Sequence, residues 1–319
     1  MSPIFSTSRI FIGFIFTSSL FAVFSYIYYS RKDNKDTSIK GFFCFLVPKS
    51  IYLSNSSLVD LKLFLAYRIT SGLLSPILGL MSITAFSLMF SGLLAKYWVS
   101  PGWASGPYGP YIFALLYLLI ADFAYYVAHA LSHKNPFLWQ FHAVHHSPKF
   151  MTPLTLYRLH PLDGITFKSV KNVIEGFLLG GLIFLFMGKI DIYRIFGMNF
   201  IYFVFTIAAS NLRHSHIWIS WGRVLNHIFI SPAHHQIHHS ARMKHWGKNH
   251  GQVFAIWDWM FGTLLLPSEE IRKNLVMGLF VNKPDPHTGL RAATAYPFQM
   301  IGKMLRQRYK TFKSGSAAS

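Results

Sequence analysis

Residues Tyr111–Lys134 read YIFALLYLLIADFAYYVAHALSHK, and this stretch decides the fold class. Its apolar part, from Tyr111 to about Ala130, is long enough to cross a bilayer, which takes about 20 residues of α-helix. The segment ends on His129 and His133, which are four residues apart and therefore share one face of a helix. The sequence thus predicts a transmembrane helix that presents two imidazole rings at its end.

The composition of the whole chain is that of a membrane protein. Of the 319 residues, 52% are hydrophobic and only 13% are charged. The single cysteine, Cys44, excludes an intramolecular disulfide framework and iron–sulfur or multi-cysteine metal sites. The formal charge of +19 comes from Lys and Arg that lie between and after apolar segments. They form no basic stripe on a polar domain, so no nucleic-acid partner is expected.

Five apolar segments predict about five transmembrane helices. Ile10–Tyr29 is expected to be an anchor helix and not a signal peptide, because it is long, aromatic to its end and without a small-residue cleavage site. A second span is expected over residues 70–99, before the Gly/Pro turn that precedes the third. Residues 173–212 are interrupted by MGKID and predict two more spans. The expected fold is an all-α integral membrane protein, an anchor plus two hairpins, with a cytosolic helical cap that holds a histidine-rich dimetal site.

Basic residues predict which side each loop occupies. The loop after the anchor carries five of them and is expected to be cytosolic: Arg31, Lys32, Lys35, Lys40 and Lys49. Counting spans from this loop places both histidine-rich segments and the C-terminus on the same side. The tail after Ile271 carries nine Lys/Arg against Asp285 alone. It predicts a basic amphipathic helix on the membrane surface, with a solvated tail near anionic lipid as the alternative.

Fifteen of the 16 histidines lie between His129 and His250. The segments FHAVHHS and SPAHHQIHHS each contain His-x-x-His-His, whose i, i+3, i+4 spacing places three rings on one face of a helix. One metal ion takes about four to six ligands, so eight or nine convergent imidazoles imply two ions. For any one of these histidines taken alone, the alternative is a hydrogen-bonded packing role.

The kind of ligand favours one chemistry over others. The chain has only 11 acidic residues and contains neither His-Glu-x-x-His nor Glu-x-x-His, so the ligands are almost all neutral. Ions held by imidazole keep their positive charge and open positions, which suits redox chemistry with dioxygen better than hydrolysis. Two alternatives are a histidine-rich membrane metal transporter, which would place ionisable residues near the middle of several spans, and a membrane zinc hydrolase, which would need a general base.

Seven short motifs carry a resemblance to a known family. AHALSH, FHAVHHS, RLHPLD, NLRHSHI, SPAHHQIHHS, NHG and WDWMFGT, in this order, resemble the sterol desaturase/fatty acid hydroxylase superfamily of integral membrane di-iron oxygenases. The resemblance covers residues 111–266. It implies two iron ions, O2 as co-substrate, and hydroxylation or desaturation of a C–H bond of a membrane lipid (a sterol, a fatty acyl lipid or a related one). Hydroxylation is the first expectation, because it needs one hydrogen abstraction followed by return of a hydroxyl, and desaturation on the same centre is the alternative. Residues 1–56 would then be the anchor and basic loop, 57–270 the membrane di-iron oxygenase domain, and 271–319 the basic membrane-surface tail.

The resemblance also implies the metal ligands. Carried over position by position, they are His129, His133, His142, His145, His146, His214, His235, His238 and His239.

Further polar residues are expected to support these ligands or to add to them: Asp122, Arg158, His160, Asp163, His216, His234, His245, His250 and Asp258. Asp122 must face the helical bundle, where it polarises a ligand or pairs within the bundle. Arg158, His160 and Asp163 are expected to orient the cluster or, alternatively, to cap a turn. Asp258 is expected to accept a ring N–H from a ligand. His227 and His287 are expected to be ordinary polar residues.

Electrons must come from another protein. The sequence contains no haem-binding cytochrome domain, flavin fingerprint or iron–sulfur cysteines. A separate electron donor is therefore expected, either a ferredoxin, a cytochrome or a reductase. The expected location is an integral membrane position with the active site on the cytosolic face, in the inner membrane of a bacterium or the endoplasmic reticulum of a eukaryote.

Overall fold

The structure is a computed structural model, and it describes residues 12–103, 106–186 and 212–316. These residues form helices and loops, and their only strand-like pairings are two isolated bridges, Phe229 with Phe254 and Ser240 with Met277. The all-helical character predicted from the sequence is therefore confirmed over this part of the chain.

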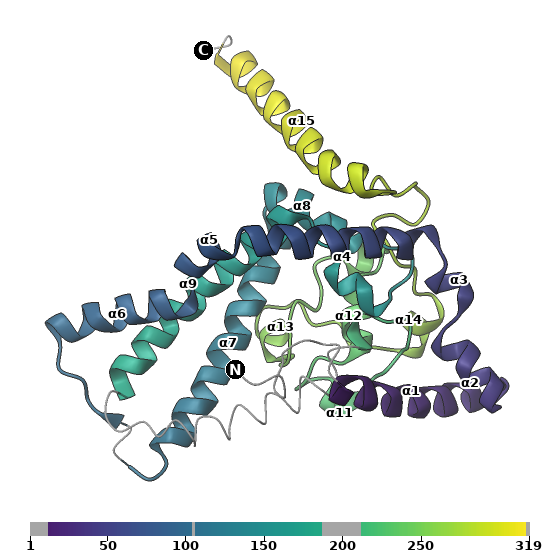
Figure 1. Cartoon of the computed structure of the whole chain (residues 1–319), viewed down its shortest axis with the longest axis horizontal. Coiled ribbons are helices and arrows are strands. Elements are labelled where there is room, and N and C mark those ends of the chain that lie inside the picture. Colours follow the sequence, from purple (N-terminus) through teal and green to yellow (C-terminus); the bar gives the residue numbers. More distant parts are fainter. Residues whose placement is uncertain (1–11, 104–105, 187–211, 317–319) are drawn as a thin grey trace.

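Two long helices form the apolar part of the molecule. They are α7 (Gly109–Lys134) and α9 (Pro161–Phe186), and each is long and apolar enough on its own to cross a membrane. Helix α9 packs between α7 and α6 (Ile83–Tyr97) (Figure 1). Gly180 permits this packing, because a Cβ there would lie 2.7 Å from the carbonyl oxygen of Ser87 in α6. Helix α9 begins at Pro161 and not near residue 173, since proline suits the first helical turn and Asp163 favours its N-terminus.

The prediction of one span over residues 70–99 is wrong. The chain there forms the end of α4 (Asn55–Leu73), then α5 (Ser75–Leu80) and then α6. Pro76 lies in the first turn of α5, and the side chain of Ser82 caps α6 by accepting the Ala85 N–H. Ile39–Tyr52 and Asn55–Leu73 meet at 78° and would add a third candidate span only if taken together. The predicted turn MGKID and the fifth predicted span, up to residue 211, lie outside the described residues.

The predicted anchor segment forms α1 (Ile12–Lys32), followed by α2 (Ile39–Leu46) and α3 (Lys49–Tyr52). Helix α1 packs against the segment after residue 212, where Ala22 is buried with Ile217 and Ile219. The Ser25 hydroxyl donates a hydrogen bond to the carbonyl of Trp218, 2.8 Å away. Helix α1 thus packs directly against the segment that carries His214.

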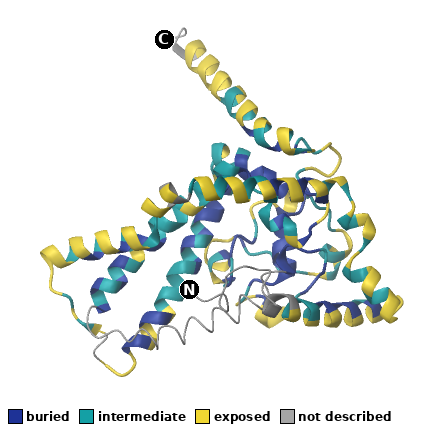
Figure 2. Ribbon diagram, in the orientation of Figure 1, coloured by how far each residue is buried: buried dark blue, intermediate teal, exposed yellow. Residues whose placement is uncertain are grey.

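Short helices and loops hold the histidine-rich region together beside the ends of α7 and α9 (Figure 1). They are α8 (Pro136–His146), η3 (Pro153–Tyr157), α11 (Gly222–Leu225), α12 (Pro232–His238), η4 (Met243–His245), α13 (Ile256–Met260) and α14 (Glu269–Lys273). Asn135 begins α8 by accepting the N–H groups of Phe137 and Leu138, and Ser231 begins α12 in the same way. Figure 2 shows that this region holds much of the buried part of the molecule.

The C-terminal segment forms α15 (Leu290–Ser316), which extends away from the other helices (Figure 1). Its beginning is anchored, because Ala293 is buried and Phe298 contacts the ring of Phe141 in α8. Most of the remaining helix is exposed (Figure 2). The buried contacts of α15 are thus at its beginning, and farther along the helix the Arg308 guanidinium lies over the ring of Phe137, 5.2 Å from its centroid.

Candidate metal centre

The nine histidines that the resemblance implies as ligands come together in two groups. Group one consists of His129, His133, His142, His146 and His238, and group two of His145, His214, His235 and His239. Within each group the ring nitrogens that could bind a metal lie within 4.8 Å of one another. Helices α7, α8 and α12 and the segment after residue 212 contribute the rings, so the site depends on the packing of all four.

Adjacent histidines in the sequence serve different groups. His145 and His146 follow each other at the end of α8, yet His145 belongs to group two and His146 to group one. His238 and His239 at the end of α12 divide in the same way. Each His-x-x-His-His motif therefore bridges the two groups, which holds them side by side.

Hydrogen bonds fix the orientation of three rings in group one. Nδ1 of His129 donates to the carbonyl of His250 at 2.8 Å, and Nδ1 of His238 donates to the carbonyl of Lys248 at 2.7 Å. Nδ1 of His142 donates to the Asp163 carboxylate at 3.1 Å. An oxygen acceptor requires the proton on Nδ1, which leaves Nε2 as the atom with a free lone pair.

The buried Nε2 atoms of group one fit a metal ion. Those of four rings are inaccessible and have no hydrogen-bond partner: His133, His142, His146 and His238. Buried polar atoms in folded proteins are almost always hydrogen-bonded, so four unsatisfied nitrogens in one place need an explanation. A metal ion held by these nitrogens would satisfy them together.

The spacing of the ring nitrogens in group two also fits a metal ion. Its Nε2 atoms approach one another at 3.2 Å between His145 and His214, at 2.9 Å between His214 and His235, and at 3.1 Å between His235 and His239. Two nitrogens that each lie about 2.1 Å from one ion, at right angles, are about 3 Å apart. The four nitrogens are thus spaced as ligands of one ion would be.

Burial keeps the imidazole rings in the form that binds metals. Burial, and then the charge of neighbouring His142, lower the pKa of His145 to about 3. Burial, followed by repulsion from neighbouring imidazoles, also holds the pKa of several other rings well below the ordinary value: His146, His235, His238 and His239. These rings are neutral at physiological pH, so each has one ring nitrogen with a lone pair available to a metal ion.

Of the three residues expected to orient the cluster together, Asp163 is the one whose side chain hydrogen-bonds to a ring of either group among the described residues, while the backbone of Arg158 lies beside the ring of His145. Arg158 instead donates to the carbonyl of Val144 and the hydroxyl of Ser147 at the end of α8. His160 donates from Nε2 to the carbonyl of Thr294, the first part of α15. Arg158 therefore holds the helix that carries the ligands, and His160 belongs to the contact with α15.

The expectation that Asp258 accepts a ring N–H is wrong. Its carboxylate accepts the backbone N–H groups of His250 and Gly251, at 2.8 and 2.7 Å, and the Thr263 hydroxyl at 2.6 Å. It thereby fixes the turn whose His250 carbonyl orients His129. A carboxylate among backbone N–H groups has no need of a ring partner.

Asp122 pairs within the protein, the second of its two expected roles. Its carboxylate accepts the backbone N–H groups of Val253 and Phe254, at 2.9 and 3.0 Å, and the indole N–H of Trp257 at 3.0 Å. This carboxylate in α7 thus holds the segment that follows the turn at His250.

The other candidate histidines lie outside both groups. Nε2 of His216 donates to the carbonyl of Phe45, Nδ1 of His234 accepts the N–H of Ser231, and Nδ1 of His245 lies 2.9 Å from the Ser240 hydroxyl. The ring of His250 is closer, with its centroid 4.8 Å from that of His133 and both nitrogens buried without a partner.

A cavity of about 480 Å³ opens onto group one. His133, His146 and His238 line it, together with His250 and a residue that the sequence did not single out, His287. The expectation that His287 is an ordinary polar residue is wrong, because it is only 1% exposed and lines this cavity. It stands alone in the sequence, far from the other histidines, so no spacing pattern could indicate it.

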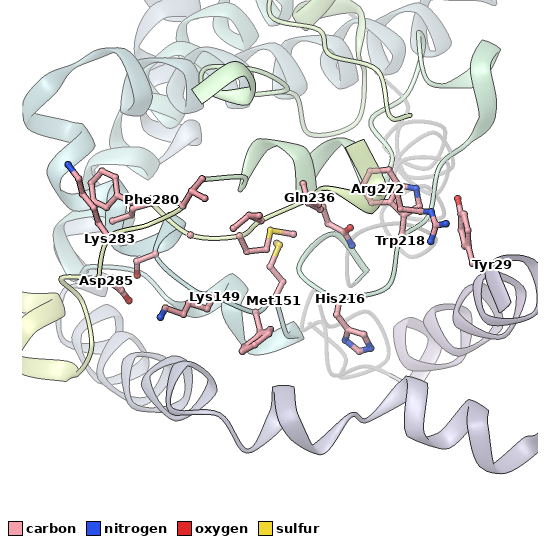
Figure 3. A pocket seen from close by; sticks show the side chains of 18 of the residues that line it. Tyr29, Lys149, Met151, His216, Trp218, Gln236, Arg272, Phe280, Lys283 and Asp285 are labelled. Atoms are coloured by element: carbon pink, nitrogen blue, oxygen red, sulfur yellow. The ribbon is translucent and has the colours of Figure 1, made fainter. Parts of the chain in front are cut away.

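Figure 3 shows a second cavity, of about 590 Å³, whose lining shares Gly278, Leu279 and Phe280 with the first. Tyr29 and Arg272 lie at one end of it and Lys283 and Asp285 at the other, with His216 between them (Figure 3). No histidine of group one or group two lines it. The smaller cavity is therefore the one that gives access to the rings.

The contact between Asp163 and His142 leads to a testable prediction. In Asp163→Leu the Nδ1 proton of His142 loses its acceptor, so the ring is no longer held with Nε2 towards group one. Loss of such a partner lowers metal affinity by about 10- to 100-fold. We expect this loss in a titration with a metal chelator, and only a small part of it in Asp163→Asn, whose side-chain oxygen still accepts. Equal affinity in Asp163→Leu and the wild type would contradict the assignment.

Comparisons with known proteins agree with the motifs. The fatty acid hydroxylase family model matches residues 114–263, which hold both groups. The ornithine lipid hydroxylase OlsE of Rhizobium tropici is 30% identical over a match that covers 59% of this chain and 51% of that protein. An alkylglycerol monooxygenase of Caenorhabditis elegans is 29% identical, over 46% of this chain and 26% of that protein. A putative Delta(7)-sterol-C5(6)-desaturase 2 of Arabidopsis thaliana is 30% identical, over 50% of each chain.

The chain spans about half the length of two of these relatives and about a quarter of the third. No solved structure matches. The matched region is nonetheless the one in which the motifs lie and the two histidine groups meet. Residues 114–263 match this family, so the resemblance to the sterol desaturase/fatty acid hydroxylase superfamily that the motifs predicted is confirmed over that region.

Proposed function

We propose that this protein is a membrane-bound, non-haem di-iron oxygenase that uses O2 to hydroxylate a C–H bond of a membrane lipid. The observation that carries the proposal is the pair of buried histidine groups, whose inward nitrogens fit two ions side by side. Two of the relatives, an ornithine lipid hydroxylase and an alkylglycerol monooxygenase, support the substrate class. Two bound iron ions would supply the activation of O2.

The chain's own residues would bind the two ions and orient the rings that hold them. Group two would hold one ion through four Nε2 atoms, and group one the other through five rings. Asp163 and the carbonyls of Lys248 and His250 keep the protons of three rings on Nδ1. Almost all of these rings are buried, which keeps bulk water away from the centre.

A zinc hydrolase is disfavoured by the position of the acidic groups. Hydrolysis by a metal-bound water needs a general base beside the metal. Among the described residues, Asp163 has the one carboxylate in contact with a ring of either group, and it is already engaged as the acceptor of the His142 N–H. A transporter is disfavoured as well, because the rings gather at the ends of α7 and α8 and in α12 and not along the spans.

Hydroxylation is preferred to desaturation for a chemical reason. Hydroxylation needs one hydrogen to be removed and one oxygen to be delivered, whereas desaturation also needs a second C–H bond held at the oxidant. Desaturation stays the alternative, because a sterol desaturase is among the relatives.

The masses of the membrane lipids would show whether the protein oxidises them. We expect lipids from cells that produce the protein to gain one oxygen atom relative to lipids from cells that produce His145→Ala, as measured by mass spectrometry. Loss of two hydrogens without added oxygen would instead identify a desaturase. Identical lipids in the two cell lines, at equal protein levels and with a matched electron donor, would contradict the proposal.

The histidine groups lie at one end of the apolar helices. Helix α7 ends at Lys134, just after His133, and α9 begins at Pro161, close to Asp163. We propose that this end faces the cytosol, where a separate ferredoxin, cytochrome or reductase would deliver electrons, in an inner membrane or the endoplasmic reticulum. The basic residues after α1 support this orientation. A reporter fused after Ser319 should be active on the cytosolic side, and activity only on the opposite side would refute the orientation.

Helix α15 would then lie along the membrane surface. Its exposed apolar residues recur at helical spacing, at Phe298, Leu305, Tyr309 and Phe312. Six basic residues and no acidic ones accompany them: Arg291, Lys303, Arg306, Arg308, Lys310 and Lys313. This combination favours contact with anionic lipid headgroups.

A further inference from the structure

His287 is a further polar residue in the lining of the cavity beside group one. Three rings of group one line the same cavity, and His287 comes from the loop before α15. The remaining lining includes the apolar or aromatic side chains of Trp139, Leu279, Phe280, Tyr296 and Met300. An apolar chain that entered this cavity would reach group one and His287 together.

The ring of His287 is buried without a hydrogen bond. It is 1% exposed, and neither of its ring nitrogens has a partner that satisfies hydrogen-bond geometry. A buried polar group without a partner costs free energy, so such groups are rare unless a ligand or water satisfies them. A ligand in the cavity is in the right place to do so.

Neighbouring residues hold this ring in place. The Asp285 carboxylate accepts the backbone N–H of His287 at 2.8 Å and is itself paired with Arg158 at 3.2 Å. The edge of the ring packs against Tyr296, with centroids 5.4 Å apart. Nδ1 lies 3.4 Å from the Asp285 carboxylate, which favours the proton on Nδ1. Nε2 is then left as a hydrogen-bond acceptor.

We propose that the reacting segment of the substrate binds in this cavity and that Nε2 of His287 accepts a hydrogen bond from it. The substrate is then a lipid with a hydroxyl or amide N–H close to the carbon that is oxidised, and not a plain acyl ester or hydrocarbon chain. His287 is a positioning residue, because it fixes which carbon lies against group one. This inference rests on the proposed function for its chemistry, but the binding itself needs no turnover.

Tryptophan fluorescence offers a direct readout, since Trp139 and Trp246 both line the cavity. The full-length protein in detergent would be titrated with hexadecanamide, which carries N–H donors, and with methyl hexadecanoate, which has the same chain length and none. We expect the wild type to bind the amide about tenfold more tightly, the effect of one hydrogen bond. His287→Leu should bind both probes equally, while His227→Leu, at an exposed histidine, should keep the preference.

His287→Gln provides a second variant, because its side-chain oxygen can accept the same bond and should restore part of the preference. Metal content and thermal midpoint, measured on each variant, show whether the site is intact. An unchanged preference in both His287 variants, or no quenching by either probe, would overturn the inference. A failure of the proposed function would look different. The wild type would then hold no metal or would not oxidise lipid, whatever its preference between the two probes.

Discussion

Replacing His238 with alanine is expected to remove the ion held by group one and to lower lipid oxidation by about 100-fold or more, since loss of a metal-orienting contact alone costs about 10- to 100-fold. His238 is 4% exposed, its Nε2 has no other partner, and its Nδ1 is held by the carbonyl of Lys248. His145→Ala should likewise remove the ion held by group two and lower lipid oxidation. The measurement is the number of metal ions per chain, by mass spectrometry of the purified proteins, alongside activity.

His227→Ala is the matched control, because His227 is exposed and lies outside both groups. It should keep the metal content and activity of the wild type. Wild-type metal content in both His145→Ala and His238→Ala would show that the two groups do not bind the metal.

Asp60→Ala is expected to produce the largest loss of stability. Asp60 and Arg158 form an ion pair at 2.9 Å in which both side chains are almost completely buried. Removal of the carboxylate leaves a buried guanidinium with only the partly exposed Asp285 as an ionic partner. Breaking such a buried pair costs about 3 to 5 kcal/mol. The thermal midpoint of the detergent-solubilised protein should therefore fall by many degrees.

The same change should weaken the metal centre. Arg158 also binds the carbonyl of Val144 and the hydroxyl of Ser147, at the end of the helix that carries His145 and His146. The double variant Asp60→Ala/Arg158→Met, which removes both charges, should recover a large part of the lost stability. An unchanged midpoint in Asp60→Ala alone would show that the pair does not support the fold.

The candidate ligands could be predicted because helical spacing is a local property. His142, His145 and His146 recur at i, i+3 and i+4, and this spacing directs their rings to one side of α8 whatever lies around the helix. Their division between two groups could not be predicted, since it depends on how α7 and α12 pack against α8. The roles of the Lys248 and His250 carbonyls could not be predicted either. Every residue has a backbone carbonyl, so the sequence does not indicate which of them accepts a hydrogen bond from a ring.

Hydropathy predicted the fold less completely than the histidine spacing predicted the site. Residues 70–99 have a high mean hydropathy, yet Pro76 and the cap at Ser82 divide them into separate helices. Hydropathy averages over a window and does not register such breaks. Helix α7, which has no internal breaker, closely matches its predicted extent.

The central claim is that the two histidine groups form an oxygenase centre that acts on lipid. The most direct measurement supplies the purified, iron-loaded protein with a reductant, a membrane lipid extract and 18O2, and then determines the mass of the lipid products. The account predicts a product that carries one 18O atom and is absent with His238→Ala. Product oxygen that comes from water, or oxidation that proceeds without O2, would contradict it.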